Sequence, residues 1–137
     1  MGNPDGSGEG ASRGGLVEPL ILDAGVFIAL DNPSQRRVVL ALTERMRAEG
    51  VDPTTNEAAL AQAWRDPARQ VPIVMLVKAT TVYPFGDPKV IGMRCARADT
   101  SDVVDASLAV LADQLHRPIL TTDPADMARL DVAYQEL

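Results

Sequence analysis

The sequence predicts a single domain of the α/β class with a parallel sheet. Its 137 residues suit one domain, and from Leu16 onward short apolar runs alternate with longer segments of helical periodicity. Residues 1–15 are rich in glycine and poor in apolar side chains. We therefore expect 1–15 to form a disordered tail and 16–137 to form the domain.

The first elements follow from an apolar run and a helical repeat. Residues 20–22 are Leu-Ile-Leu and end at Asp23, which is typical of a buried parallel strand. Residues 26–30 can begin a helix. A second helix is expected from Pro33, a favourable first position, to about Glu49, because Gly50 provides a stop signal.

The middle of the chain gives weaker signals. Residues 51–54 predict a weak strand, and β-branched and aromatic side chains at 80–83 predict another. The polar side chains of Thr55 and Asn56 are possible helix starts. The expected helices are one from Thr55 or Asn56 to Trp64, one from Pro67 to about Val77 and one over 88–98.

The last third of the chain predicts one long helix followed by one strand. Apolar side chains recur at helical spacing for about fifteen residues from Ser101. Residues 118–120 then read as a strand that runs into Thr121-Thr122-Asp123. Strands that alternate with helices favour parallel pairing through right-handed crossovers.

Composition and charge exclude several classes of protein. Cys95 is the only cysteine, so the chain has neither an intrachain disulfide nor a cysteine-based zinc site. The net charge is −6, which argues against a polybasic tail for membranes or nucleic acid. No apolar run is long enough to span a membrane and no signal peptide is evident, so we expect a cytoplasmic protein with no membrane contact.

Acidic side chains follow the predicted strands. Because ligands of open parallel sheets bind beyond the carboxyl ends of the strands, these acids are candidates for one site. Clustered carboxylates repel one another unless a cation neutralises them, and oxygen ligands favour Mg²⁺ or Mn²⁺. Such ions assist hydrolysis of phosphate esters. The candidate acids are Asp23, Glu57, Asp102, Asp105 and Asp123.

Most of these acids also fit an ordinary capping role. Asp23 and Asp123 are each placed to cap a following helix, and Thr54 with Glu57 fits a capping box. Asp102 suits the first turn of a helix, where the helix dipole favours a negative charge. Asp105 is different, because it lies past the cap beside an apolar helix face. The functional interpretation therefore depends on the acids occurring together.

Four segments resemble the PIN domain, and specifically the VapC-type toxin ribonucleases of toxin–antitoxin pairs. They occur in the family's order and extend from about residue 19 to the C-terminus. The resemblance implies a three-layer α/β/α, Rossmann-like fold with a central, mainly parallel sheet of four to five strands. The segments are LILDAGVFIAL (20–30), TTNE (54–57), SDVVDASLA (101–109) and ILTTDPADM (119–127).

The resemblance also implies the site and its chemistry. Asp23, Glu57, Asp105 and Asp123 match the four catalytic, metal-binding acids, and Asp102 and Asp126 are neighbours that can join them. The implied reaction is hydrolysis of an RNA phosphodiester by metal-activated water. The family often has a hydroxyl or amide side chain just after the first aspartate, whereas this chain has Ala24 and Gly25.

The substrate and partners are expectations of the same kind. An RNA substrate, whether tRNA, rRNA or mRNA, must meet positive or hydrogen-bonding groups. The resemblance further implies a VapB-like antitoxin and a homodimer. The alternative is a catalytically silent PIN-like domain that binds RNA or a protein partner. The candidate substrate-binding residues are Thr121, Arg65 and Arg69, with Lys89, Arg94 and Arg97 as further basic candidates; each basic one also fits an ordinary solvated helix face.

Overall fold

A five-stranded parallel sheet forms the centre of the protein. The computed structural model describes residues 18–137, so the tail expected at 1–15 lies outside the described residues. The strand order is β3-β2-β1-β4-β5, and every neighbouring pair is parallel. The strands are β1 (Ile21–Leu22), β2 (Thr54–Asn56), β3 (Thr81–Tyr83), β4 (Ile119–Thr121) and β5 (Tyr134–Glu136).

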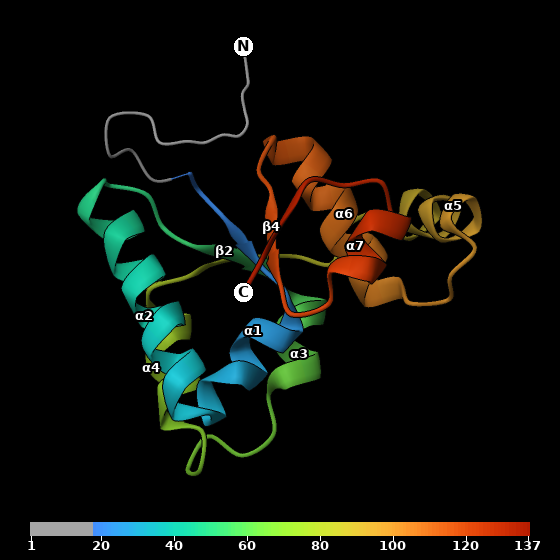
Figure 1. The fold of residues 1–137 in the computed structure, drawn as a ribbon. Coiled ribbons are helices and arrows are strands. Elements are labelled where there is room, and N and C mark those ends of the chain that lie inside the picture. The colour runs from blue at the N-terminus through green and yellow to red at the C-terminus, as the bar shows by residue number, and fades with distance from the viewer. Residues whose placement is uncertain (1–17) are drawn as a thin grey trace.

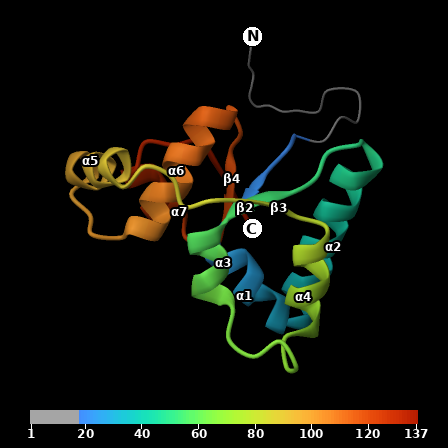
Figure 2. The ribbon, with the colours of Figure 1, turned by 180° about the vertical axis from the view of Figure 1, so that it is seen from behind.

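Helices cover both faces of this sheet. Figure 1 shows α1, α2 and α4 on one side and α5, α6 and α7 on the other, and Figure 2 shows the same division from behind. The expected three-layer α/β/α architecture is confirmed. The helices are α1 (Ala24–Ile28), α2 (Pro33–Ala48), α3 (Glu57–Ala63), α4 (Val71–Lys78), α5 (Pro88–Ala98), α6 (Val103–Leu115) and α7 (Pro124–Arg129), with a 3-10 turn at Ala29–Asp31 after α1.

Alternate residues of the central strands point into two separate cores. Ile21 and Ile119 pack with α5, α6 and α7, whereas Leu22 and Leu120 pack with α1, α2 and α4. This is the consequence of the two-residue period of a strand. The apolar runs that predict β1 and β4 therefore bury both faces of the sheet and hold their carboxyl ends side by side.

Strand β2 lies three residues later than the sequence predicts. The strand expected at 51–54 is found at Thr54–Asn56, a polar segment that is nonetheless buried. Its side chains are paired across the fold: Thr55 Oγ1 donates to the Leu22 carbonyl (2.7 Å) and Asn56 Nδ2 donates to Ser107 Oγ (2.9 Å). Because hydrogen bonds satisfy these polar groups, burial does not require an apolar sequence here.

The segment between α3 and α4 also differs from expectation. The helix expected from Pro67 begins only at Val71. The intervening loop is held by Gln70, whose side chain accepts the backbone N–H groups of Arg65 (2.8 Å) and Asp66 (3.0 Å). Strand β5 was not expected from the sequence, since it is polar and exposed. Among residues 18–137, no helix is long and apolar enough to cross a membrane.

Candidate functional site

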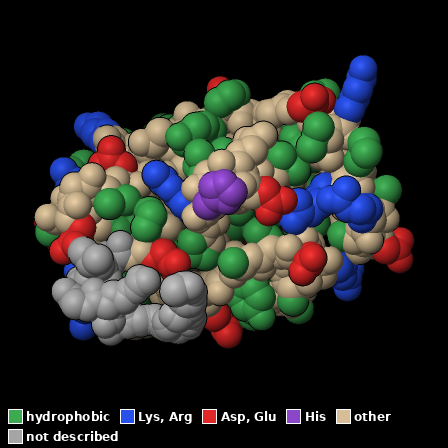
Figure 3. All heavy atoms as spheres, turned by 90° about the horizontal axis from the view of Figure 1, so that it is seen from above, with side chains coloured by type: hydrophobic (Ala, Val, Ile, Leu, Met, Phe, Trp, Pro, Cys, Tyr) green, Lys and Arg blue, Asp and Glu red, His purple; other side chains and the backbone are tan. Residues whose placement is uncertain are grey.

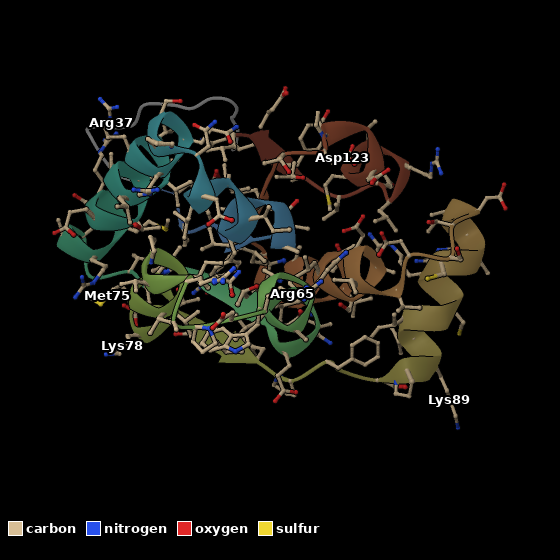
Figure 4. The ribbon with its side chains drawn as sticks, turned by 90° about the horizontal axis from the view of Figure 1, so that it is seen from below. Arg37, Arg65, Met75, Lys78, Lys89 and Asp123 are labelled. Carbon is tan, nitrogen blue, oxygen red and sulfur yellow. The ribbon has the colours of Figure 1, made fainter. Side chains whose placement is uncertain are left out.

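The acids identified from the sequence lie at the carboxyl edge of the sheet. Asp23 directly follows β1, Glu57 begins α3 after β2, and Asp123 follows β4 by two residues. Asp102 and Asp105 lie at the start of α6, and Asp126 lies in the first turn of α7. Figure 4 looks onto this edge, with Asp123 labelled beside α7.

Asp23 is the most restrained of these acids. Its side chain is 4% exposed, and Oδ1 accepts the N–H of Val26 (3.0 Å), which caps α1. Burial raises the pKa of this carboxyl, and hydrogen bonds from the Thr121 hydroxyl and from the backbone of Val26, Gly25 and Thr122 oppose the rise. The capping and site interpretations are therefore compatible, because one buried carboxylate serves both.

Thr121 joins the ends of β1 and β4. Its side chain is completely buried, and its Oγ1 accepts the N–H of Asp123 at 2.9 Å. The same hydroxyl group hydrogen-bonds the Asp23 carboxyl. Its hydroxyl therefore links the Asp23 carboxyl to the backbone of Asp123, and its predicted role in substrate binding stays a prediction.

Asp105 and Asp126 lie within electrostatic range of the other acids. The pKa of Asp105 is raised to about 7, first by burial and then by the charges of Asp102, Asp126 and Asp23. The pKa of Asp126 is raised by its hydrogen bond with Asp123, by burial and by the charges of Asp123 and Asp102. Five carboxyl groups thus repel one another at one edge, which favours binding of a cation.

Two of the acids behave differently as helix caps. Asp102 Oδ1 accepts the N–H of Asp105 at 3.0 Å and caps α6. Asp123 occupies the cap position of α7, but its side chain makes no capping hydrogen bond. The carboxylate of Asp123 is therefore available for another role.

Glu57 stands apart from this group. It is exposed, and the main charges that raise the pKa values of the other acids do not include it. The capping box expected for Thr54 and Glu57 is wrong. Asn56 caps α3 instead, by accepting the N–H of Ala59 at 2.9 Å. Thr54 lies in β2, where its hydroxyl accepts a hydrogen bond from Arg117 (2.8 Å).

The chemistry of these acids suits a divalent cation, but their side chains are not arranged around one common point. Their donors are all carboxylate oxygens, which Mg²⁺ and Mn²⁺ prefer. In the described side-chain conformations, no three His, Cys, Asp or Glu side chains of residues 18–137 are close enough to hold a metal ion. Occupancy would require rotation of exposed carboxylates such as Asp102 and Asp123 toward the buried Asp23.

A close contact explains the glycine that follows Asp23. A Cβ atom on Gly25 would lie 2.1 Å from the Oγ1 of Thr122 and 3.3 Å from Oδ1 of Asp23. Any side chain at position 25 would therefore collide with the Thr122 hydroxyl. The polar side chain that the resemblance leads one to expect after the first aspartate is absent, and the hydroxyl of Thr122 occupies that space.

Of the basic candidates, one is structural and the others are exposed. Arg94 is buried and structural, because it pairs with Asp113 and donates to the carbonyl of Leu130. Arg69 is exposed beside Asp66, at 3.6 Å. Arg65 is exposed and donates to the carbonyls of Ala61 (3.2 Å) and Trp64 (2.8 Å). Lys89 and Arg97 are exposed on α5.

No protein-family model matches this sequence, and no curated protein does. Solved structures do match. FitAcB from Neisseria gonorrhoeae is 17% identical with a TM-score of 0.62, and the match covers 84% of this chain and 95% of that one. PAE2754 from Pyrobaculum aerophilum is 14% identical with a TM-score of 0.64, covering 87% and 83%. VapBC2 from Rickettsia felis, bound to a promoter DNA fragment, is 10% identical with a TM-score of 0.63, covering 86% and 98%.

These three are PIN-domain proteins. The chain has the PIN-domain fold. The resemblance inferred from its sequence motifs is thereby confirmed at the level of the fold. The candidate acids lie at the carboxyl edge of this PIN-type sheet.

Sequence reasoning missed two residues of this PIN-type edge. Thr122 was not singled out, and its only signal was the unusual glycine at position 25, whose counterpart in space could not be identified from the sequence. Arg129, one turn along α7 from Asp126, lowers the pKa of that carboxyl and was also overlooked. A basic side chain in the last turn of a short helix is common, so its position gave no warning.

Proposed function

We propose that this protein is an endoribonuclease that depends on Mg²⁺ or Mn²⁺ and acts as the toxin of a toxin–antitoxin pair. The observation that carries the proposal is the group of carboxyl groups around Asp105, whose pKa is raised by burial and by the charges of Asp102, Asp126 and Asp23 at the carboxyl edge of a PIN-type sheet. Such a group is stabilised by a divalent cation and is costly without one.

The acids would have different roles in holding a metal ion. Asp23, held by Thr121 and the start of α1, is the fixed ligand. Asp105 and Asp123 approach it from α6 and from the end of β4, and Asp102 and Asp126 add negative charge around them. Glu57 enters only by turning its exposed side chain inward. A bound ion would polarise the phosphate and activate water.

The toxin role is supported by the kind of proteins that share the fold. FitAcB and VapBC2 belong to toxin–antitoxin systems. A VapB-like antitoxin for this chain is also consistent with its surface. Four large apolar side chains on the α1–α2–α4 side of the sheet are each at least half exposed: Ile28, Val38, Val71 and Met75. A cytoplasmic homodimer remains part of the proposal.

The decisive experiment is cleavage of a mixed tRNA, rRNA and mRNA pool by the purified protein, with Mg²⁺ or Mn²⁺ and with EDTA. We expect discrete fragments that disappear with EDTA and in the Asp23→Asn and Asp105→Asn variants. The matched control is Asp52→Asn, which removes an exposed acid before β2 and should cleave like the wild type.

Absence of cleavage by folded, antitoxin-free wild-type protein under every metal condition would reject the nuclease proposal. It would favour the second candidate function, a PIN-like domain that binds RNA or a protein partner without cutting. That candidate is favoured specifically by the separation of the carboxylates in the described conformations.

A further inference from the structure

A second site lies between α5, α6 and the end of α7. It is a cavity of about 510 Å³ whose walls include Arg94 and Arg97 from α5, Asp113 from α6, and Arg129 and Asp131 from the end of α7. None of these five residues belongs to the acid group. Figure 3, centred on His116 at the end of α6, shows basic side chains gathered beside acidic ones toward the α5 side.

Arg94 forms the fixed part of this cavity. Its side chain is buried, pairs with Asp113, and donates from Nη2 (2.9 Å) and Nε (3.2 Å) to the carbonyl of Leu130. These bonds tie α5, α6 and the end of α7 together. Because Asp113 balances its charge, Arg94 shapes the cavity without supplying its excess charge.

Arg97 and Arg129 supply the excess charge. Both are exposed in the last turns of their helices. Neither lies within 4.0 Å of a carboxylate in the part of the chain that the structure describes. The cavity thus has three arginines against two aspartates, in a protein whose net charge is −6. Two unpaired guanidinium groups at one concavity suit an anion, and phosphate above all, because it can accept two parallel hydrogen bonds.

The cavity is connected to the acid group by α7. Asp126 lies in the first turn of this helix and Arg129 in its last, and Arg129 is close enough to lower the pKa of Asp126. A six-residue helix is about 9 Å long. A single nucleic-acid strand held at the acids would have to run along α7, away from the carboxyl edge, to reach the arginines.

We propose that Arg97 and Arg129 bind backbone phosphates of an RNA strand, away from the bond that the acids cleave. This inference rests on the proposed function. It would explain how an acidic protein holds a polyanion, since the attraction is concentrated at one cavity at the far ends of α6 and α7 from the acids. The class of ligand is single-stranded RNA, recognised through its phosphates and not its bases.

The test is equilibrium binding of a fluorescent single-stranded RNA to the full chain in EDTA, which prevents metal-dependent cleavage. The Arg97→Gln/Arg129→Gln variant is compared with Arg37→Gln/Arg45→Gln, which removes two exposed arginines from α2 on the other side of the sheet. The two variants have the same net charge. Thermal unfolding of each variant checks that it is folded.

We expect the Arg97/Arg129 variant to bind at least about tenfold more weakly, and the control pair to bind within about twofold of the wild type. The slope of the logarithm of the binding constant against the logarithm of the salt concentration should also become shallower by roughly 1.4, which corresponds to two lost phosphate contacts on a single strand. Equal weakening by both pairs would overturn the proposal, because net charge alone would explain it.

Equal binding by the wild type and the Arg97/Arg129 variant would also overturn it. If that variant instead lost binding of a poly-glutamate peptide, the cavity would be assigned to an acidic protein segment. Cleavage assays with Mg²⁺ or Mn²⁺ keep the two proposals apart. RNA binding that depends on these arginines without any cleavage would retain this cavity and reject the nuclease. If the Arg97/Arg129 variant both cleaved and bound RNA like the wild type, the nuclease proposal would stand and the cavity proposal would be rejected.

Discussion

The two halves of the acid-bearing edge differ in how firmly they hold their side chains. On the β1–β4 side, Asp23 is buried and bonded to Thr121, which also holds the backbone of Asp123. On the β2 side, Glu57 is exposed and lies outside the main electrostatic interactions. Both acids follow a parallel strand, so their backbones are similarly placed.

This difference shows that a strand end places a residue at a site but does not aim its side chain. At β2 the capping role is taken by Asn56, which leaves Glu57 at the first, outward position of α3. At β1 the aspartate itself is the cap, so its carboxylate is turned inward. The inward half should therefore dominate metal binding.

The largest expected effect is on RNA cleavage by substitutions in each half. Asp105→Asn should lower the cleavage rate by at least about a hundredfold, whereas Glu57→Gln should lower it by about tenfold, as expected for a residue outside the main ligand set. Single-turnover rates at saturating Mg²⁺ measure both. Equal losses of cleavage rate would show that Glu57 turns toward the metal ion. The two halves of the edge would then contribute equally to metal binding.

The repulsion on the β1–β4 side should appear as a pH dependence of stability without divalent ions. Since the pKa of Asp105 is raised from 3.8 to about 7, the folded chain holds a proton that the unfolded chain loses. The free energy of unfolding should therefore fall as the pH rises from about 4 to 7 and then level. Chemical denaturation in EDTA across this range measures it.

The Asp105→Asn variant should flatten this pH profile, and Mg²⁺ should restore stability at pH 8. Asp52→Asn serves as the control and should keep the wild-type slope. A wild-type profile that rises between pH 4 and 7 would contradict the coupling of these acids.

A smaller effect is expected from paired threonine substitutions. Thr121→Val and Thr55→Val each remove a completely buried hydroxyl that is hydrogen-bonded, one in each half. Each should cost about 1–3 kcal/mol of unfolding free energy, because a buried partner is left unpaired. Only Thr121→Val should also lower cleavage and Mg²⁺ affinity, since only Thr121 bonds Asp23. Identical catalytic losses would make both threonines merely structural.

The last comparison concerns two glycines, of which Gly92 should give the smallest effect. Gly25→Ala should destabilise the fold by about 1–3 kcal/mol through collision with Thr122, and adding Thr122→Ala should recover most of that loss. Gly92→Ala, on the exposed side of α5 with open space around it, should instead stabilise by about 0.5–1 kcal/mol. Thermal unfolding of the three variants measures both signs. Destabilisation by Gly25→Ala that persists in the double variant would reject the collision.

The sequence predicted the fold wherever burial was apolar. Strands β1 and β4 and helices α2, α5 and α6 follow from hydrophobic runs and periodicity. Strand β2 was misplaced because its burial depends on hydrogen bonds between side chains distant in sequence, and β5 was missed because it is exposed. The start of α4 depends on the Gln70 side chain, which local patterns do not reveal.

Prediction of the site was limited in the same way. The sequence correctly placed all the candidate acids at the carboxyl edge, because strand order determines backbone position. It did not distinguish the inward Asp23 from the outward Glu57, nor identify Arg94 as structural. Side-chain direction depends on which residue caps each helix and on tertiary partners such as Asp113.

The contact between Gly25 and Thr122 has an evolutionary consequence. One small volume beside Asp23 can be filled from either of two positions that are far apart along the chain, but not from both. Descendants of a common ancestor are then expected to inherit these positions as a pair: a gain of a side chain at the first would select for its loss at the second. A homologue with a side chain at position 25 and none at position 122 would keep the fold and the acids. Its sequence after Asp23 would differ, so its relationship to this chain would be harder to recognise.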